Sequence, residues 1–291
     1  MYSTLMHHSL IEEQNMPAEK SLRPQSRLSL FTVALCSLFA LVAAFACIAP
    51  AGAQESGGPK QILITFRCAA ADRPAFRAYL QGEESHMLEK LKVEGVLKSY
   101  HLLFNPFVTT GTWDAMTVLN FSTYAATQRW KDIEQKYPAG LTAAGLKLAK
   151  PIQTYSADLA WEGVASDPGP DDKHVFYIIP YSYNSLDQYK SYVDGYVIPQ
   201  LRGWMKEGVL SRYSLYLNRY GTGDPWDALF IYEYRDLENF GKREETVTKV
   251  RATLRDDPTW KHLSDIKATL RTESENTIAE ELKPTPIKKR K

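Results

Sequence analysis

The chain has 291 residues, of which 44% are hydrophobic, 24% are charged and 12% are aromatic. This composition excludes an intrinsically disordered protein and suits one large domain or two small ones. Lys and Arg total 35 against 34 Asp and Glu, a formal charge of +1. The basic excess that nucleic-acid binding usually needs is therefore missing, and we expect no nucleic-acid partner. The three cysteines cannot form a disulfide framework.

The N-terminal region has the layout of an export signal. Residues 28–53 contain no charge and end in small residues at Ala51-Gly52-Ala53. The basic residues that precede this stretch are Lys20, Arg23 and Arg27. A basic segment, an apolar segment and a small-residue site in this order predict a secretory signal peptide over residues 1–53.

Cleavage after Ala53 would leave an exported protein, periplasmic or extracellular, with no stable membrane insertion. A retained N-terminal anchor, a lipoprotein beginning at Cys47 and a true start at Met16 stay open as alternatives. Only Cys68 would survive cleavage, and its apolar surroundings, ILITFRCA, predict a buried and inert thiol.

The remaining chain contains an internal repeat with an offset of 113 residues. Residues 94–105, EGVLKSYHLLFN, align with residues 207–218, EGVLSRYSLYLN, and Trp113-Asp114-Ala115 aligns without a gap with Trp226-Asp227-Ala228. Eleven of the 22 positions compared are identical, which indicates duplication of one unit. The predicted divisions are signal peptide 1–53, first repeat 60–163, linker 164–173, second repeat 174–282 and basic disordered tail 283–291.

The first copy begins with a β-branched apolar run that predicts a buried strand. Its expected elements are a strand at 62–69, a helix from Asp72 to Gly95, strands at 100–107 and 113–122, a helix at 124–137 and a strand at 153–161. The second copy is expected to hold a strand at 175–181, a helix from Ser185 to Gly208 that kinks at Pro199, a hairpin turned by Gly221, Gly223 and Pro225, a helix at 237–254, a short helix after Pro258 and a last strand within 269–282.

The order β-α-β-β-α-β in each copy is that of a ferredoxin-like unit, so the predicted class is α+β with two tandem units. A sheet that is apolar on both faces needs a second sheet as well as helices to cover it. Two such units in one chain resemble the dimeric α/β-barrel superfamily, and more particularly its tandem members, over residues 60–282. The resemblance implies a fused barrel that forms a pseudo-dimer, and we expect a monomer.

That resemblance implies a range of activities rather than one. Members include cofactor-free monooxygenases, polyketide cyclases, a lactone isomerase, haem proteins, chlorite dismutase-like enzymes and stress-responsive proteins. Ligands in such proteins usually lie between the sheet and its helices. Helical histidines ligate iron in some haem-binding relatives, so haem at His86 is an alternative; no cofactor is otherwise predicted, and no His/Cys cluster has metal-ligand spacing.

His101 is the candidate catalytic residue. It shares a strand face with Asn105, and the aligned position in the second copy is Ser214. A histidine beside an amide could act as a general base in a pocket, or it could be a polar residue with a purely structural role. Arg67 aligns with Pro180 in the same offset, so we expect any polar site in the first copy.

Aromatic strand residues supply the candidate ligand-binding groups. Each could instead have a structural role: the tryptophans could seal contacts between layers, the asparagines could cap turns, and Asp114 and Asp227 are interpreted as strand-start hydrogen-bonding groups. The candidate ligand-binding set is Tyr100, Asn105, Trp113, Tyr213, Tyr216, Asn218 and Trp226. The leading hypothesis is an exported protein that binds a small apolar or aromatic molecule. A cofactor-free enzyme using His101 and a pocketless interaction or stress protein are the alternatives.

Overall fold

The computed structural model describes residues 60–170, 172–220 and 226–286. The predicted signal peptide, the predicted turn glycines and proline of the second hairpin, and the end of the basic tail lie outside the described residues. Within the described residues, no helix has the length and apolar character needed to cross a membrane.

The strands and helices recur in the same order in both halves of the chain. The strands are β1 (Gln61–Cys68), β2 (Leu97–Phe104), β3 (Ala115–Phe121), β4 (Ala149–Val164), β5 (Val175–Tyr183), β6 (Leu210–Asn218), β7 (Ala228–Tyr234), β8 (Arg271–Glu273) and β9 (Thr277–Glu281). The α-helices are α2 (Arg73–Tyr79), α3 (Ser85–Val93), α4 (Thr127–Glu134), α5 (Ala143–Leu148), α6 (Leu186–Tyr192), α7 (Ile198–Lys206), α8 (Leu237–Gly241), α9 (Arg243–Leu254) and α10 (Pro258–Leu270). Short 3-10 turns are η1 (Ala70–Asp72) and η3 (Pro138–Gly140), and π-helical turns are η2 (Leu80–Glu84) and η4 (Val193–Val197).

The predicted α+β class is confirmed, with differences at several boundaries. The last strand of the first half is longer than predicted because β4 pairs with two different strands in succession. The last strand of the second half is divided into β8 and β9, and the predicted helix at 237–254 is divided after Gly241. The predicted tail is attached at its start, because the N–H of Thr285 donates to Gln81 O at 2.8 Å.

The irregularity predicted at Pro199 occurs in both halves. A π-helical turn precedes α7 at Val193–Val197, but an equivalent turn precedes α3 at Leu80–Glu84, where no proline follows. Both turns contain a mid-helix glycine, Gly82 or Gly195. The break therefore does not depend on the missing N–H of the proline.

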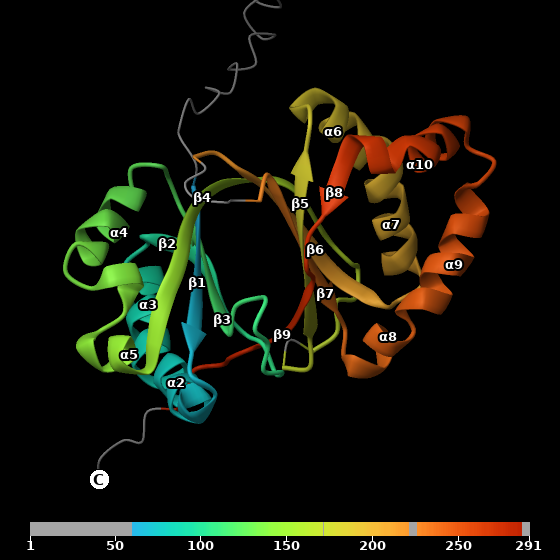
Figure 1. Ribbon diagram of the computed structural model, residues 1–291. Coiled ribbons are helices and arrows are strands. Elements are labelled where there is room, and N and C mark those ends of the chain that lie inside the picture. Colours follow the sequence, from blue (N-terminus) through green and yellow to red (C-terminus); the bar gives the residue numbers. More distant parts are fainter. Residues whose placement is uncertain (1–59, 171, 221–225, 287–291) are drawn as a thin grey trace, which may run out of the picture. The chain divides into compact units, whose positions relative to one another are not determined.

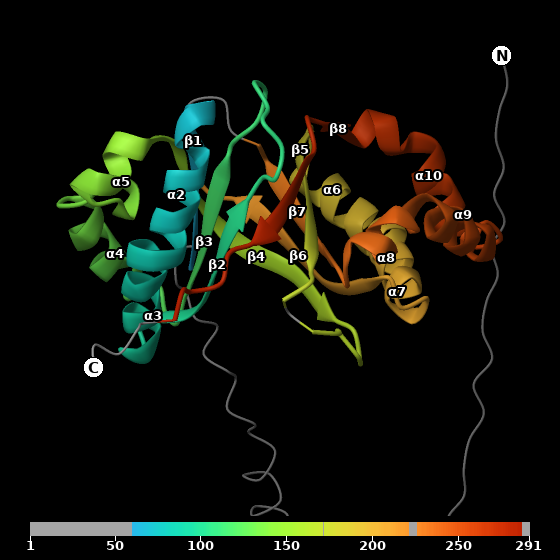
Figure 2. The same cartoon turned by 90° about the horizontal axis from the view of Figure 1, so that it is seen from below.

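The strands form one closed ring. Hydrogen bonding joins them in the order β7-β6-β4-β1-β3-β2-β9-β5, and β5 also pairs with β7, while β8 lies on β5 beyond β9. Two strands connect the halves: β4 pairs with β1 and then with β6, and β9 pairs with both β2 and β5. Helices α2–α5 cover one side of this barrel and α6–α10 cover the other (Figure 1). The view from below shows the same division (Figure 2).

Strand alternation divides the core into three clusters. One lies inside the barrel and contains Leu63, Leu103, Val118, Phe176 and Ile231. The other two lie between the outer faces of the sheet and the helices of each half. These two outer layers are filled by large side chains that are fully buried, such as Trp130 in the first half and Tyr189 in the second.

A buried carboxyl group interrupts the outer layer of the first half. Glu84 is 2% exposed, and its Oε1 has no hydrogen-bond partner among the described residues. Gly140, at φ +83°, closes over it: a Cβ there would lie 2.7 Å from the Trp130 ring and 3.3 Å from Glu84 Oε1. Burial raises the pKa of Glu84 to about 8, so the carboxyl is protonated at neutral pH.

Glu84→Gln should make folding stability less dependent on pH. The unfolded carboxyl ionises near 4.5 and the folded one near 8, so the protonated form stabilises the fold fully below pH 4.5 and that contribution is lost as pH rises to 8. Urea unfolding should show equal stability of variant and wild type near pH 4, and a variant more stable by up to about 5 kcal/mol at pH 8.5. Glu83→Gln, at a solvent-facing neighbour, is the control, and equal pH profiles for all three proteins would contradict the assignment.

Candidate functional site

A cavity of about 980 Å³ opens at one end of the barrel. Its walls come from β1, β3, β5 and β7, the loop between β2 and β3, and the segments around β4 and β9. We call it the mouth cavity. Its apolar and aromatic lining consists mainly of Trp113, Met116, Tyr155, Ile178, Trp226 and Leu229. This volume and lining are typical of sites that enclose a small organic molecule.

Two of the predicted ligand-binding residues, Trp113 and Trp226, meet in this cavity although they lie in different halves. The rings of Tyr155 and Trp226 are 4.9 Å apart at an angle of 37°, a tilted aromatic contact. Both tryptophans are only partly buried, so their ring surfaces are available to a ligand. The prediction from sequence had placed ligands between sheet and helices, whereas this cavity lies at the barrel mouth.

A repeated hydrogen-bond pattern holds the two tryptophans in place. The Asp114 carboxylate accepts the N–H of Cys68 at 2.9 Å, and the Asp227 carboxylate accepts the N–H of Tyr183 at 2.9 Å. These contacts confirm the interpretation of both aspartates as strand-start hydrogen-bonding groups. They also show that β1 and β5 correspond with an offset of 115 residues rather than 113. Arg67 therefore corresponds to Ser182, and its predicted match with Pro180 is wrong.

The predicted ligand groups Asn105 and Asn218 act in the turns beside the tryptophans. Asn218 Nδ2 donates to Trp226 O at 3.0 Å, and Asn105 Nδ2 makes the matching contact with Trp113 O at 3.5 Å. The Asn105 side-chain oxygen also accepts the N–H of Phe107 at 2.9 Å. Neither amide lines the mouth cavity, so they position the tryptophans, as the turn-capping alternative predicted.

The first half adds a buried ion pair behind Trp113. Arg73 contacts the Asp114 carboxylate and donates to Asn105 O, and Arg73 and Asp114 are 8% and 3% exposed. The guanidinium also lies 4.9 Å from the centroid of the Phe104 ring. The equivalent residue in the second half, Leu186, carries no charge. The two aspartates therefore do different work: Asp114 neutralises a buried cation, and Asp227 does not.

Cys68 borders the mouth cavity but is not an activated nucleophile. Burial, followed by the charge of Asp114, raises the pKa of its thiol to about 11. The thiol is therefore protonated at neutral pH. The prediction of an inert thiol agrees with this, although the side chain is half-buried rather than fully buried.

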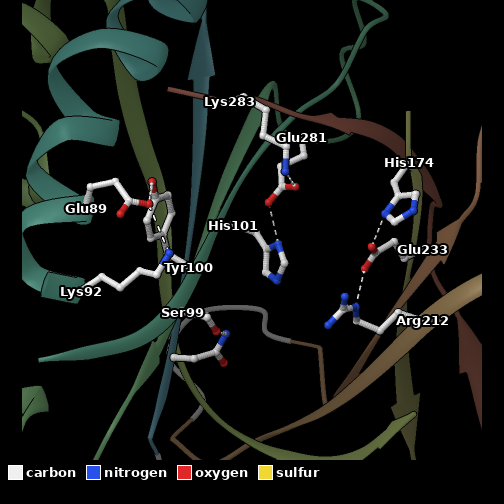
Figure 3. Close-up of polar contacts among 11 residues, drawn as sticks. Glu89, Lys92, Ser99, Tyr100, His101, His174, Arg212, Glu233, Glu281 and Lys283 are labelled. Carbon is white, nitrogen blue, oxygen red and sulfur yellow. Dashed lines mark hydrogen bonds and ion pairs between the residues drawn. The ribbon is translucent and has the colours of Figure 1, made fainter. Parts of the chain in front are cut away.

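The predicted catalytic residue, His101, lies inside the barrel on the inward face of β2, away from the mouth cavity lining (Figure 3). Its Nδ1 lies 2.8 Å from Glu281 Oε1, and its ring is 5.9 Å from that of Phe176. Burial alone would raise the pKa of Glu281, but the hydrogen bond and charge of His101, with help from Lys283, lower it to about 2. Because the ionised carboxylate only accepts, Nδ1 must donate, and in neutral His101 the lone pair is on Nε2.

A second polar group inside the barrel was missed by the sequence analysis. Glu233 on β7 contacts His174 Nδ1 and also lies 3.2 Å from Arg212 Nε (Figure 3). His174 Nε2 lies 3.1 Å from Pro168 O. Both ring nitrogens therefore face acceptors, which fits a doubly protonated imidazole. The contact ties the linker between the halves to the barrel. Its sequence signal was weak because His174 stood in the predicted linker.

The other predicted ligand residues are distributed elsewhere. Tyr100 faces the helices, and its hydroxyl donates to Glu89 Oε1 at 3.0 Å (Figure 3). Tyr213 belongs to the outer layer of the second half. Tyr216 is inside the barrel and 2% exposed, and burial raises its pKa. None of the three lines the mouth cavity.

His86, the alternative haem ligand, does not fit that role. It lies on α3, where its Nε2 is 3.2 Å from Thr285 O in an exposed contact. It does not line the mouth cavity. Among the described residues, no three His, Cys, Asp or Glu side chains are grouped so that they could hold a metal ion.

Comparison with solved structures shows similarity of fold at low sequence identity. A candidate monooxygenase from Lactobacillus acidophilus matches with a TM-score of 0.49 and 13% identity, covering 77% of this chain and 94% of its own. An anthrone oxidase-like protein matches with a TM-score of 0.48 and 10% identity, covering 76% and 91%. A chlorite dismutase variant from Candidatus Nitrospira defluvii matches with a TM-score of 0.47 and 13% identity, covering 78% and 92%. No protein-family model and no curated protein matches the sequence.

Asp114→Ala should destabilise the protein more than Asp227→Ala. The first change leaves the Arg73 guanidinium buried without its counter-ion, which costs about 3–5 kcal/mol. The second removes one hydrogen bond to a backbone N–H, worth about 1 kcal/mol. Urea unfolding at pH 7 measures both. The double variant Arg73→Leu/Asp114→Ala, which copies the Leu186 of the second half, should recover part of the loss; equal losses in the two single variants would contradict the assigned role of the ion pair.

Proposed function

We propose that this chain is an exported small-molecule-binding protein whose apolar or aromatic ligand occupies the mouth cavity. One observation carries the proposal: Trp113 from the first half and Trp226 from the second line one cavity of about 980 Å³, with Tyr155 against Trp226. Large aromatic side chains that remain partly exposed in a concave site offer flat apolar surface at little cost in conformational entropy.

The organisation of the chain belongs to the same proposal. Residues 60–163 and 174–282 are two copies of one ferredoxin-like unit, and their sheets together form the barrel that holds the ligand. The matching intervals of η2 and η4, of α3 and α7, and of β3 and β7 support this duplication. The export signal at residues 1–53 and a monomeric state complete the proposal.

A second candidate function rests on the His101–Glu281 pair. A carboxylate that fixes the tautomer of an imidazole leaves the other nitrogen ready to accept a proton, which is the arrangement of a general base. A cofactor-free monooxygenase, isomerase or cyclase could use it. Binding is the leading proposal because His101 does not line the mouth cavity.

Trp226→Ala should weaken binding of a neutral aromatic probe. N-phenyl-1-naphthylamine, whose fluorescence rises in apolar surroundings, is titrated into residues 54–291. Loss of the aromatic contact should raise its Kd about tenfold, equivalent to about 1.4 kcal/mol. Trp161→Ala, at a tryptophan outside the mouth cavity, should leave the Kd unchanged. Equal affinity in all three proteins, or no binding to the wild type, would overturn the proposal.

His101→Ala tests the enzyme candidate. Oxygen uptake with a panel of polycyclic phenols should disappear in this variant, while the melting temperature falls by only a few degrees because His101 is partly exposed. His262→Ala, at an exposed histidine of α10, serves as the control. If turnover survives in His101→Ala, or if the wild type takes up no oxygen with any member of the panel, a His101 monooxygenase is ruled out.

A further inference from the structure

One wall of the mouth cavity carries unpaired positive charge. Arg67 on β1 and Lys150 on β4 stand directly opposite each other in the strand pairing, and Lys147 lies close by in the chain. All three line the cavity. Among the described residues, none of the three forms an ion pair. Like charges directly opposite each other on neighbouring strands are destabilising, so the pair requires another explanation.

The loop beside the cavity fixes the position of Arg67. Its Nη1 donates to Thr110 O at 3.0 Å and its Nη2 donates to Thr112 O. Its Nε is buried and has no hydrogen-bond partner. Neutral carbonyl oxygens orient the guanidinium without cancelling its charge. The positive charge is thus held next to the aromatic wall.

The second half shows that the fold does not need these cations. Because Cys68 and Tyr183 are equivalent, the pair that corresponds to Arg67 and Lys150 is Ser182 and Thr272. The same position of the sheet is therefore occupied by two short neutral side chains in one half and by two cations in the other. This difference indicates that the cations serve a ligand rather than the sheet.

Two carboxylates also line the cavity. Asp72 and Glu275 are among its residues, and the Glu275 carboxylate lies against Gly111. Neither forms an ion pair with Arg67, Lys147 or Lys150, since no such contact lies within 4.0 Å. The lining thus keeps more positive than negative charge, with the cations gathered on the β1–β4 side.

We propose that the mouth cavity selects aromatic molecules that carry an anionic group, a carboxylate or a sulfonate, with the ring against Trp226 and the anion at Arg67 and Lys150. This inference rests on the proposed binding function and names the chemical class of its ligand. A guanidinium and an ammonium beside an apolar wall provide the charge-assisted hydrogen bonds that such an anion accepts.

Two probes that differ mainly by one sulfonate test the inference. 8-Anilino-1-naphthalenesulfonate and N-phenyl-1-naphthylamine have the same two ring systems, but only the first is an anion. The wild-type protein should bind the sulfonate more tightly than the amine, and added salt should weaken only the sulfonate. Lys150→Thr, which copies Thr272 of the second half, should raise the Kd of the sulfonate about fivefold and leave that of the amine within about twofold.

Lys98→Thr is the matched control, because it removes the same charge from an exposed strand residue outside the cavity. It should change neither Kd. If both probes bind wild type and Lys150→Thr with equal affinity, anion selection is overturned and the binding function stands. If neither probe binds the wild type, the binding function is overturned and the inference with it. Unchanged binding of the neutral amine by Lys150→Thr shows that this variant is folded.

Discussion

Two strands that cross between the halves hold the whole arrangement together. β4 pairs first with β1 and then with β6, and β9 joins β2 to β5. Without these pairings each half would expose an unpaired strand edge and the apolar inner face of its sheet, a combination that invites aggregation. With them the ring closes within one chain, and the inner faces cover each other. The length of β4, 16 residues, follows from this double role.

Closure also decides what chemistry each part of the interior can support. The inward positions of the strands hold Leu63, Val118 and Phe176 in the middle of the barrel, so water is excluded there. Polar side chains lie away from this apolar centre, in the His101–Glu281 and Glu233–His174 contacts. Tryptophans that open β3 and β7 are brought from 113 residues apart in the chain to a single cavity. A site made in this way needs both halves.

Much of the fold could be predicted from local patterns, but the partners of the site residues could not. Repeated Trp-Asp-Ala segments and strand alternation placed Trp113 and Trp226 on neighbouring strands and His101 on an inward face. Alternation states which face a residue occupies and says nothing about which distant chain segment lies opposite. Glu281 therefore went unrecognised as the partner of His101, 180 residues away. The ungapped repeat likewise misaligned Arg67, because β1 and β5 differ from the rest of the repeat by two residues.

The differences between the halves carry more functional information than the similarities. Residues kept in both, such as the two aspartates and the two asparagines, form hydrogen bonds that any copy of the fold requires. Residues that differ are free of that requirement. Arg67, opposite Lys150, takes the place of Ser182, and His101 takes the place of Ser214, with no loss of strand pairing in either half. Polar chemistry is thus concentrated in the first half, while the second half supplies Trp226 and the wall that completes the barrel.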